Sequence, residues 1–487
     1  MGDHAGAATE YQAVLREQPS DPAAEAGLGL LLLREEKWQA SLDVLEKVKA
    51  SVPDDARVIE GIGAAYAGLG NCEKAVDPLR AALDLTPDNF ALAKKLASCN
   101  AKLKRWSAVL SALRTGTLEE SRDEDATRMV VDAYVSSADV PGAESYCRWV
   151  LIATPSNFTA HLSLANLLFN ARRTRDAFTE YLEVVKLKPE MPDIQERLGD
   201  LAMELRDSSE ARVHYEAATR SASATDTARM KLARLCFAAN DAKCTQQALA
   251  AVTNPAFARE SKLLRAQIEF RAENWEQAGL LANELLPGDP QSVTLLRIAA
   301  ESSLRQNKPV EAADLFEKAM AVEPANKEFR YRLARLTLSY DELKDRLPRT
   351  VEQLSEFLQK FQQDAEAYFL LANVYRKLND AENAKANFKM GFDRIQPPIS
   401  PSLSWAYNTY GFMMIQEGKF EEAYQYETQA IRLNPGDEDS QFNFALVCLA
   451  LNKTDDLAAA RDRLLAMNSK RLADLDEQIE SKKGKKK

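Results

Sequence analysis

The sequence lacks the residues and spacings on which most enzyme and metal sites are built. Its 487 residues include only three histidines, His4, His161 and His214. No Cys-x-x-Cys pair is present to hold a metal ion. The GxGxxG, P-loop, GxSxG and HExxH motifs are also missing. We therefore expect a protein that is not an enzyme and that needs neither a cofactor nor a metal.

Long apolar runs and positive charge are lacking as well. No stretch of about 18 apolar residues occurs, so we expect no membrane-spanning helix in this chain. The net charge is −10, which argues against broad nucleic-acid binding. A content of 46% hydrophobic and 28% charged residues is typical of a folded protein.

A repeat with a period of 34 residues is what the chain does contain. Small residues recur with this period at two positions, and prolines recur in the same phase at a third. The first set is Gly29, Gly63, Ala97, Val131, Ala165, Gly199 and Ala233; the second is Ala7, Ser41, Ala75, Val109, Ala143, Ala177, Ala211 and Thr245; the prolines are Pro19, Pro53, Pro87, Pro155 and Pro189. The period and this order predict tandem helix-turn-helix units.

One unit, residues 56–89, shows why the pattern has this form. Apolar residues at helical spacing predict two helices on either side of a turn at Gly70-Asn71. Small residues at Gly63 and Ala75 let the helices approach closely, and Pro87 ends the second helix. Each pair leaves an apolar face that only a neighbouring pair can bury, so the array is stable collectively.

These units resemble the tetratricopeptide repeat (TPR) superfamily over nearly all of residues 1–465. The matching residues in three of the units are Ile62-Gly63, Tyr66, Ala75, Leu79, Ala82 and Pro87; Leu164-Ala165, Ala177, Tyr181, Val184 and Pro189; and Tyr410-Gly411, Ala423, Ala430 and Pro435. The resemblance implies an all-α fold, a right-handed superhelical solenoid of about thirteen repeats.

The period continues to the end of the array with departures. The small position returns at Ala266, Ala300, Ala334, Ala372, Gly411 and Ala445. Around Ala266 the register is ambiguous, because Leu264, Ile268 and Phe270 lie one position off the expected face. Longer gaps predict a turn insertion at Ser339–Arg349 and a Pro/Ser-rich joint at Gln396–Ser404. Each is either a surface loop or a bend.

The expected organisation follows from these positions. Residues 1–21 form the second helix of a truncated first repeat, 22–395 form repeats 1 to 11, 396–404 the joint, 405–465 repeats 12 and 13, and 466–487 a capping helix and basic tail. Either an unpaired helix caps the stack, or Met1 marks a mis-chosen start or the start of a trimmed chain; we favour trimming, with any signal or anchor upstream. Residues 455–480 are expected to form one long charged helix.

Six cysteines bear on the compartment. Cys236 and Cys244 flank a short turn, and Cys72 and Cys99 lie where neighbouring repeats touch, so both pairs could form disulfides. Disulfides would favour an exported or periplasmic protein over a cytoplasmic one, whereas buried free thiols in a cytosolic protein are the alternative.

The resemblance implies that ligands bind on the concave surface, at positions 2, 5, 6, 9, 12 and 13 of each first helix. These positions give three zones. The early zone is apolar and expected to be narrow or self-packed: Ala26, Gly27, Leu30, Ala64 and Ala67. The middle zone is basic and suits an acidic ligand: Lys231, Arg234, Arg297, Arg305, Arg332 and Arg335, with Glu301 and Glu328 interspersed. The late zone combines aromatic and amide groups: Phe369, Asn373, Trp405, Asn408, Phe412, Phe442 and Asn443.

The late zone is the sharper site hypothesis. Asparagine side chains both donate and accept hydrogen bonds, so they can hold the backbone of an extended peptide beside aromatic rings; the alternative is that they are ordinary packing residues. We expect a non-catalytic scaffold or adaptor that binds peptide segments of other proteins and assembles a multiprotein complex. The alternatives are a nucleic-acid-binding repeat protein and a regulatory subunit of an enzyme.

Overall fold

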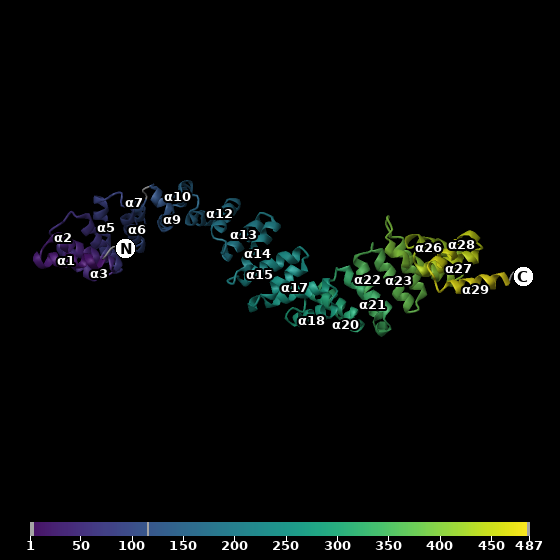
Figure 1. Cartoon of the computed structure of the whole chain (residues 1–487). Coiled ribbons are helices and arrows are strands. Elements are labelled where there is room, and N and C mark those ends of the chain that lie inside the picture. The colour runs from purple at the N-terminus through teal and green to yellow at the C-terminus, as the bar shows by residue number, and fades with distance from the viewer. Residues whose placement is uncertain (1–3, 114–115, 485–487) are drawn as a thin grey trace. The chain divides into compact units, whose positions relative to one another are not determined.

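A computed structural model describes residues 4–113 and 116–484, and these residues form helices with no strand among them (Figure 1). Met1 and the last three residues of the basic tail lie outside this part. The chain divides into two compact units, residues 1–254 and 255–487, each of which is described by itself. None of the described helices combines the length and apolar character needed to cross a membrane.

Unit 1 contains seven helix-turn-helix pairs, beginning with α2 and α3, within its described residues. Helix α1 precedes them and the one-turn helix α8 follows α7. The helices are α1 (His4–Glu17), α2 (Pro22–Arg34), α3 (Trp38–Lys49), α4 (Ala56–Gly68), α5 (Cys72–Leu85), α6 (Phe90–Lys102), α7 (Trp106–Leu113), α8 (Leu118–Arg122), α9 (Glu124–Ser136), α10 (Val140–Ala153), α11 (Phe158–Asn170), α12 (Thr174–Leu187), α13 (Pro192–Glu204), α14 (Ser208–Arg220), α15 (Asp226–Ala238) and α16 (Ala242–Ala250).

Unit 2 adds six pairs, so the described residues contain the expected thirteen. Helix α29 follows the last pair, and four short 3-10 helices are labelled η1 to η4. The elements are η1 (Pro255–Phe257), α17 (Ala258–Arg271), α18 (Trp275–Leu285), η2 (Leu286–Gly288), α19 (Val293–Arg305), α20 (Pro309–Val322), α21 (Lys327–Ser339), η3 (Asp341–Arg346), α22 (Leu347–Lys360), α23 (Ala365–Lys377), α24 (Ala381–Phe392), η4 (Pro401–Leu403), α25 (Ser404–Gln416), α26 (Phe420–Leu433), α27 (Glu438–Leu451), α28 (Thr454–Ala466) and α29 (Leu472–Gly484).

The turns in twelve of the thirteen described pairs repeat the sequence period in the backbone, whereas η3 joins α21 to α22. In these twelve turns a residue shortly after the first helix has positive φ, which ends the helix and reverses the chain. In unit 1 these residues are Glu36, Gly70, Lys104, Ala138, Arg172, Arg206 and Asn240, and in unit 2 they are Glu273, Asn307, Asn379, Gly418 and Asn452. The 34-residue spacing therefore sets backbone conformation as well as packing.

The small residues of the first helices lie under large residues of the second helices. A Cβ atom on Gly63 would come within 2.7 Å of Leu79 Cγ, and Gly29 is covered in the same way by Leu45. Ala97, Ala165 and Ala233 are fully buried. The core of each unit thus runs between the two helices of a pair and on to the next pair.

Two departures from the regular repeat take definite shapes. The predicted insertion at 339–349 contains η3, and Leu343 and Leu347 are buried, so it adds to the core instead of forming only a surface loop. The ambiguous repeat resolves with Ala266 fully buried in α17, flanked by buried Leu264 and Ile268.

The prediction of one long helix over 455–480 was wrong. Helices α28 and α29 are separated by a turn in which Asn468 has φ 51°. The Ser469 amide donates a hydrogen bond to the Leu464 carbonyl at 3.0 Å, which closes this turn. Leu464 and Leu475 are both fully buried, so α29 folds back to cover the apolar face of α28.

Only one of the two cysteine pairs that could form disulfides does so. Cys236 and Cys244 form a disulfide across the turn between α15 and α16. Cys72 and Cys99 are buried free thiols, as are Cys147 and Cys448. Burial and a hydrogen bond that the Cys99 thiol donates to the neighbouring Cys72 raise the pKa of Cys99 to about 12.

Candidate functional site

The predicted late zone lies on three successive first helices of unit 2, α23, α25 and α27. Its asparagines engage neighbouring side chains. Asn443 Nδ2 donates to Asn408 Oδ1 at 2.8 Å, and this bond links α27 to α25. Asn373 Oδ1 accepts from Arg376 Nε at 2.9 Å within α23. The structure therefore joins two asparagines directly and holds the third within its own helix.

The aromatic residues of the late zone differ in accessibility. Phe369 is fully buried and packs on Phe388, Phe392 and Trp405, with ring centroids 6.1, 4.9 and 6.4 Å away. Trp405 is half-buried, and Phe412 remains 39% exposed. A ligand could therefore reach Trp405 and Phe412, whereas Phe369 supports the core beneath them.

Phe442 takes a separate position at the end of the late zone. Its ring is half-buried, and the Arg471 guanidinium lies 5.1 Å from the ring centroid. Arg471 immediately precedes α29 and also pairs with Asp439 at 2.6 Å. The chain's own C-terminal turn thus already provides a cation for this ring.

A surface hollow of about 230 Å³ brings together residues of the middle and late zones. It is lined by Arg335, Leu338 and Ser339 of α21, Leu370 and Asn373 of α23, and Trp405 of α25. Three successive first helices therefore share one hollow. Its lining offers apolar surface, one aromatic ring, an amide and a guanidinium, which is chemistry suited to binding a peptide.

Sequence reasoning missed three residues of this hollow, namely Leu338, Ser339 and Leu370. They occupy positions 12, 13 and 6 of their first helices, which are groove positions in the pattern that the resemblance implies. The sequence prediction chose only groove residues with a charge, an amide group or an aromatic ring, and these three residues have none of them. Position in the repeat was therefore the signal that could have found them.

The basic middle zone divides between the two units. Lys231 and Arg234 lie on α15 of unit 1, and the other four lie on α19 and α21 of unit 2. Lys231 Nζ pairs with Asp200 at 2.7 Å and Glu196 at 2.8 Å. Partial burial opposes protonation, but these hydrogen bonds raise the pKa of Lys231. Its charge is thus balanced within unit 1.

The four arginines of unit 2 also have internal partners. Arg332 pairs with Glu301 at 3.2 Å, and Arg335 pairs with Glu366. On α19, the Arg297 and Arg305 guanidiniums lie 5.7 and 5.3 Å from the ring centroids of Phe270 and Trp275. The charges of Arg332 and Arg335 are thus partly balanced by carboxylates of the same unit, which weakens their attraction for an acidic ligand.

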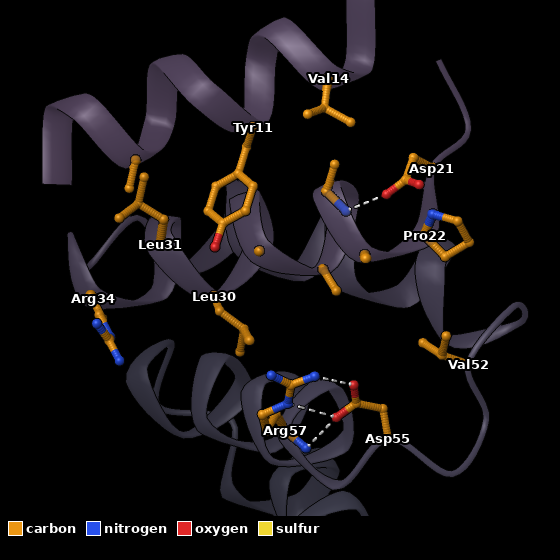
Figure 2. A pocket seen from close by; sticks show the side chains of 15 residues that line it. Tyr11, Val14, Asp21, Pro22, Leu30, Leu31, Arg34, Val52, Asp55 and Arg57 are labelled. Carbon is orange, nitrogen blue, oxygen red and sulfur yellow. Dashed lines mark hydrogen bonds and ion pairs between the residues drawn. The ribbon is translucent and has the colours of Figure 1, made fainter. Parts of the chain in front are cut away.

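The expectation that the early zone is narrow or self-packed stays a prediction: the zone borders a hollow, yet the Tyr11 ring packs on Gly27, where an added Cβ atom would lie 2.4 Å from it. Ala26, Gly27 and Leu30 line a hollow of about 920 Å³. Figure 2 shows Tyr11 and Val14 projecting from α1 toward α2, with Asp55 and Arg57 on the other side. Arg57 pairs with Asp55 at 2.8 Å. The short side chains of α2 leave this space open.

Comparisons with known proteins agree with the repeat pattern. The family model described as the N-terminal TPR repeats region of Psidin matches residues 1–112. Tetratricopeptide repeat models match residues 129–192, 196–243 and 365–389. Tetratricopeptide repeat protein 21B of Xenopus laevis is 24% identical over 320 residues, which are 64% of this chain and 23% of that protein. The chain therefore matches less than a quarter of that relative's length.

Solved structures give further similarities. The crystal structure of the APC/C hetero-tetramer Cut9–Hcn1 has a TM-score of 0.38 and 14% identity, covering 96% of this chain and 98% of that chain. The crystal structure of YrrB, a TPR protein with an unusual peptide-binding site, has a TM-score of 0.33 and 14% identity, covering 38% of this chain and 96% of that chain.

Proposed function

Since this chain belongs to the tetratricopeptide repeat superfamily, we propose that it is a non-catalytic scaffold that binds an extended segment of a partner protein in unit 2. The observation that carries this proposal is the hollow shared by α21, α23 and α25. A scaffold of this kind would assemble a multiprotein complex by presenting the hollow to one component while other surfaces hold the rest.

The lining of the hollow gives each part of a peptide a partner. Asn373 can donate to a backbone carbonyl and accept from a backbone amide, since its side chain carries both groups. The half-buried Trp405 ring and the half-buried Leu338 would cover an apolar side chain, with the buried Leu370 beneath them. Arg335 would attract an acidic group in exchange for Glu366. We therefore expect a segment that combines an apolar and an acidic residue.

The charge pairing in the middle zone favours this proposal over a nucleic-acid interface. Binding a phosphate backbone relies on lysine and arginine that are available to phosphates. Lys231, Arg332 and Arg335 instead pair with carboxylates of the same unit. Binding that weakens steeply with salt and recovers nucleic acid would contradict the proposal.

Site-specific photo-crosslinking tests the location of the partner. A benzophenone amino acid would replace Trp405 in the full chain, and a second protein would carry it at Asn387. Asn387 is half-buried on the second helix α24 and is not part of the hollow. We expect partner segments, identified by mass spectrometry, that crosslink only from position 405. The same set of segments from both positions would contradict the proposal.

Affinity measurements with the recovered segment then test the chemistry. Asn373→Ala together with Arg335→Ala should weaken binding by about tenfold or more, as expected when central interface groups are truncated. Asn387→Ala makes the same amide truncation outside the hollow and should leave the affinity unchanged. Equal affinity of all three proteins would show that the segment binds elsewhere.

A further inference from the structure

A third hollow, in unit 1, is lined by residues that follow the shortest second helix of the described repeats in the sequence. Helix α7 has 8 residues, whereas the second helices α5 and α10 have 14 each. The one-turn helix α8 packs on α10. A hollow of about 550 Å³ is found there, formed by residues of the α8, α9 and α10 region.

Three aromatic rings form one side of this hollow. The Tyr134 and Tyr146 ring centroids are 6.3 Å apart, and the Tyr146 and Trp149 centroids are 5.6 Å apart, with the planes tilted by 43° and 37°. Gly142 keeps the space beside Tyr134, because a Cβ atom there would come within 2.7 Å of Tyr134 Cδ1. The rings of α9 and α10 are therefore packed against one another, with Tyr134 and Tyr146 mostly buried and Trp149 half-buried.

The charged residues of the hollow are all acidic. Glu120 and Asp139 belong to its lining, and no lysine, arginine or histidine is among the described residues that line it. Glu120 is fully buried and its two oxygens accept from the Tyr146 hydroxyl at 2.9 Å and the Gly116 amide at 3.0 Å. Burial and the nearby charge of Glu120 raise the pKa of Tyr146, so the phenol stays neutral.

We propose that this hollow binds a quaternary or methylated ammonium group. Aromatic faces attract cations, and the attraction grows when the cation leaves water. The carboxylates of Glu120 and Asp139 also attract a cation. An unmethylated ammonium is strongly hydrated and must give up that water to lie against ring faces. A trimethylammonium group carries the charge without that strong hydration and therefore suits this lining best.

Two sources could supply this group, namely a methylated lysine of a partner protein or a small quaternary ammonium compound. The first probes are an acetylated trimethyllysine amide and choline, added to the full chain at constant ionic strength. Unmethylated acetyl-lysine amide and the neutral isostere 3,3-dimethylbutan-1-ol serve as their matched controls. Binding would be followed by titration calorimetry and by ligand-observed NMR. The tighter of the two cationic probes identifies the source.

We expect at least one methylated cation to bind about tenfold or more tightly than its control. Ser145→Arg should remove this binding, because Ser145 is exposed at the lining and its replacement would place a guanidinium in the hollow. Ser145→Ala should retain it. Trp149→Ala should weaken it by about tenfold.

Three outcomes would overturn the proposal. They are no detectable binding of either cation, equal binding of the cations and their controls, and unchanged binding to Ser145→Arg. If Trp149→Ala fails to fold, as judged by circular dichroism, the two Ser145 variants still decide the question because that position is on the surface. Loss of peptide binding in unit 2 would leave this test unaffected, since the hollow uses residues of unit 1 alone.

Discussion

The helix pairs α4–α5 and α25–α26 have the same geometry at their closest point and opposite chemistry. In each pair a glycine of the first helix lies beneath the residue sixteen positions later. Leu79 covers Gly63, with 2.7 Å between its Cγ and an added Cβ; Glu427 covers Gly411, with 2.5 Å between Oε1 and an added Cβ. Both side chains are fully buried.

The difference lies in what the buried atoms require. Leu79 needs no partner, whereas neither carboxylate oxygen of Glu427 has a hydrogen-bond partner within the described residues. Burial, with a smaller contribution from the charge of Asp437, raises the pKa of Glu427 well above its usual value. Shape therefore governs this position more strictly than polarity, because a neutral glutamic acid occupies the space of a leucine at a cost in stability.

Replacing the buried leucine of the α4–α5 pair with glutamate should have the largest effect on stability. Leu79→Glu would bury an unpartnered carboxyl and lose apolar burial, so we expect α4–α5 to be destabilised by about 4 kcal/mol. Hydrogen exchange of the α4–α5 amides in the full chain measures this locally. Leu79→Met is the control of similar volume, and an equally small loss in both variants would contradict the comparison.

The reverse exchange should stabilise the second pair. Glu427→Leu restores the Gly63–Leu79 arrangement, and we expect the α25–α26 amides to gain about 2 kcal/mol of protection. Glu427→Gln removes the ionisable group but keeps a buried polar one, so its gain should be smaller. A loss of protection in the leucine variant would contradict this prediction, because it would mean that the Glu427 carboxyl stabilises the pair.

The two glycines should respond unequally to an added methyl group. Gly63→Ala would meet Leu79 Cγ at 2.7 Å and the Leu79 backbone nitrogen at 3.0 Å, which cannot easily move. Gly411→Ala would first meet Oε1, the end of a flexible side chain. We expect losses of about 1.5 and 0.5 kcal/mol, respectively. The gain in helix propensity is common to both, so equal losses would contradict the difference.

Only the α25–α26 pair should lose stability through this position as pH rises. The folded state keeps the Glu427 proton at pH values where an unfolded glutamate has lost it. Stability from this group is therefore full below the unfolded pKa of about 4.3 and falls, by about 1 kcal/mol per pH unit, until the raised folded pKa is passed. Glu427→Gln, measured at each pH beside the natural protein, should remove this slope.

Substitutions in the turns of the two pairs should have the smallest effects on stability, and the two effects should be equal. Gly70 and Gly418 follow the two first helices with φ of 77° and 70°, and no atom lies within 4 Å of an added Cβ at either. Gly70→Ala and Gly418→Ala should each cost about 1 kcal/mol from backbone strain alone. A clear difference between the two variants, by hydrogen exchange, would show that the pairs differ in more than their buried chemistry.

Sequence reasoning found the parts of the fold that the 34-residue period controls. The small residues at Gly63 and Gly411, the turns that follow them and the thirteen pairs all depend on local spacing, which one sequence displays. It missed the turn at Asn468 because leucines on both sides continue a helical pattern. A short turn that lets α29 cover α28 depends on burial of Leu464 and Leu475 together, which periodicity does not encode.

The candidate site was harder to predict than the fold. Repeat position identified Asn373, Trp405 and Arg335, which share one hollow. The same rule selected Phe369, which is fully buried because it packs between α23 and α24 on Phe388. Whether a groove position faces outward depends on how closely adjacent pairs approach, and side-chain contacts between repeats set that distance.

The Asn408–Asn443 hydrogen bond has a consequence for how a ligand of this groove would bind. A peptide group that competes for Asn408 Oδ1 would replace a bond already made at 2.8 Å, and a carboxylate that takes the Arg335 nitrogen facing Glu366 would replace that ion pair. Such exchanges gain little free energy, of the order of 1 kcal/mol each. Each such contact would then add more to the selectivity of binding than to its affinity. Lasting assembly would depend on several contacts that form at once, and a segment held by a single contact would dissociate quickly.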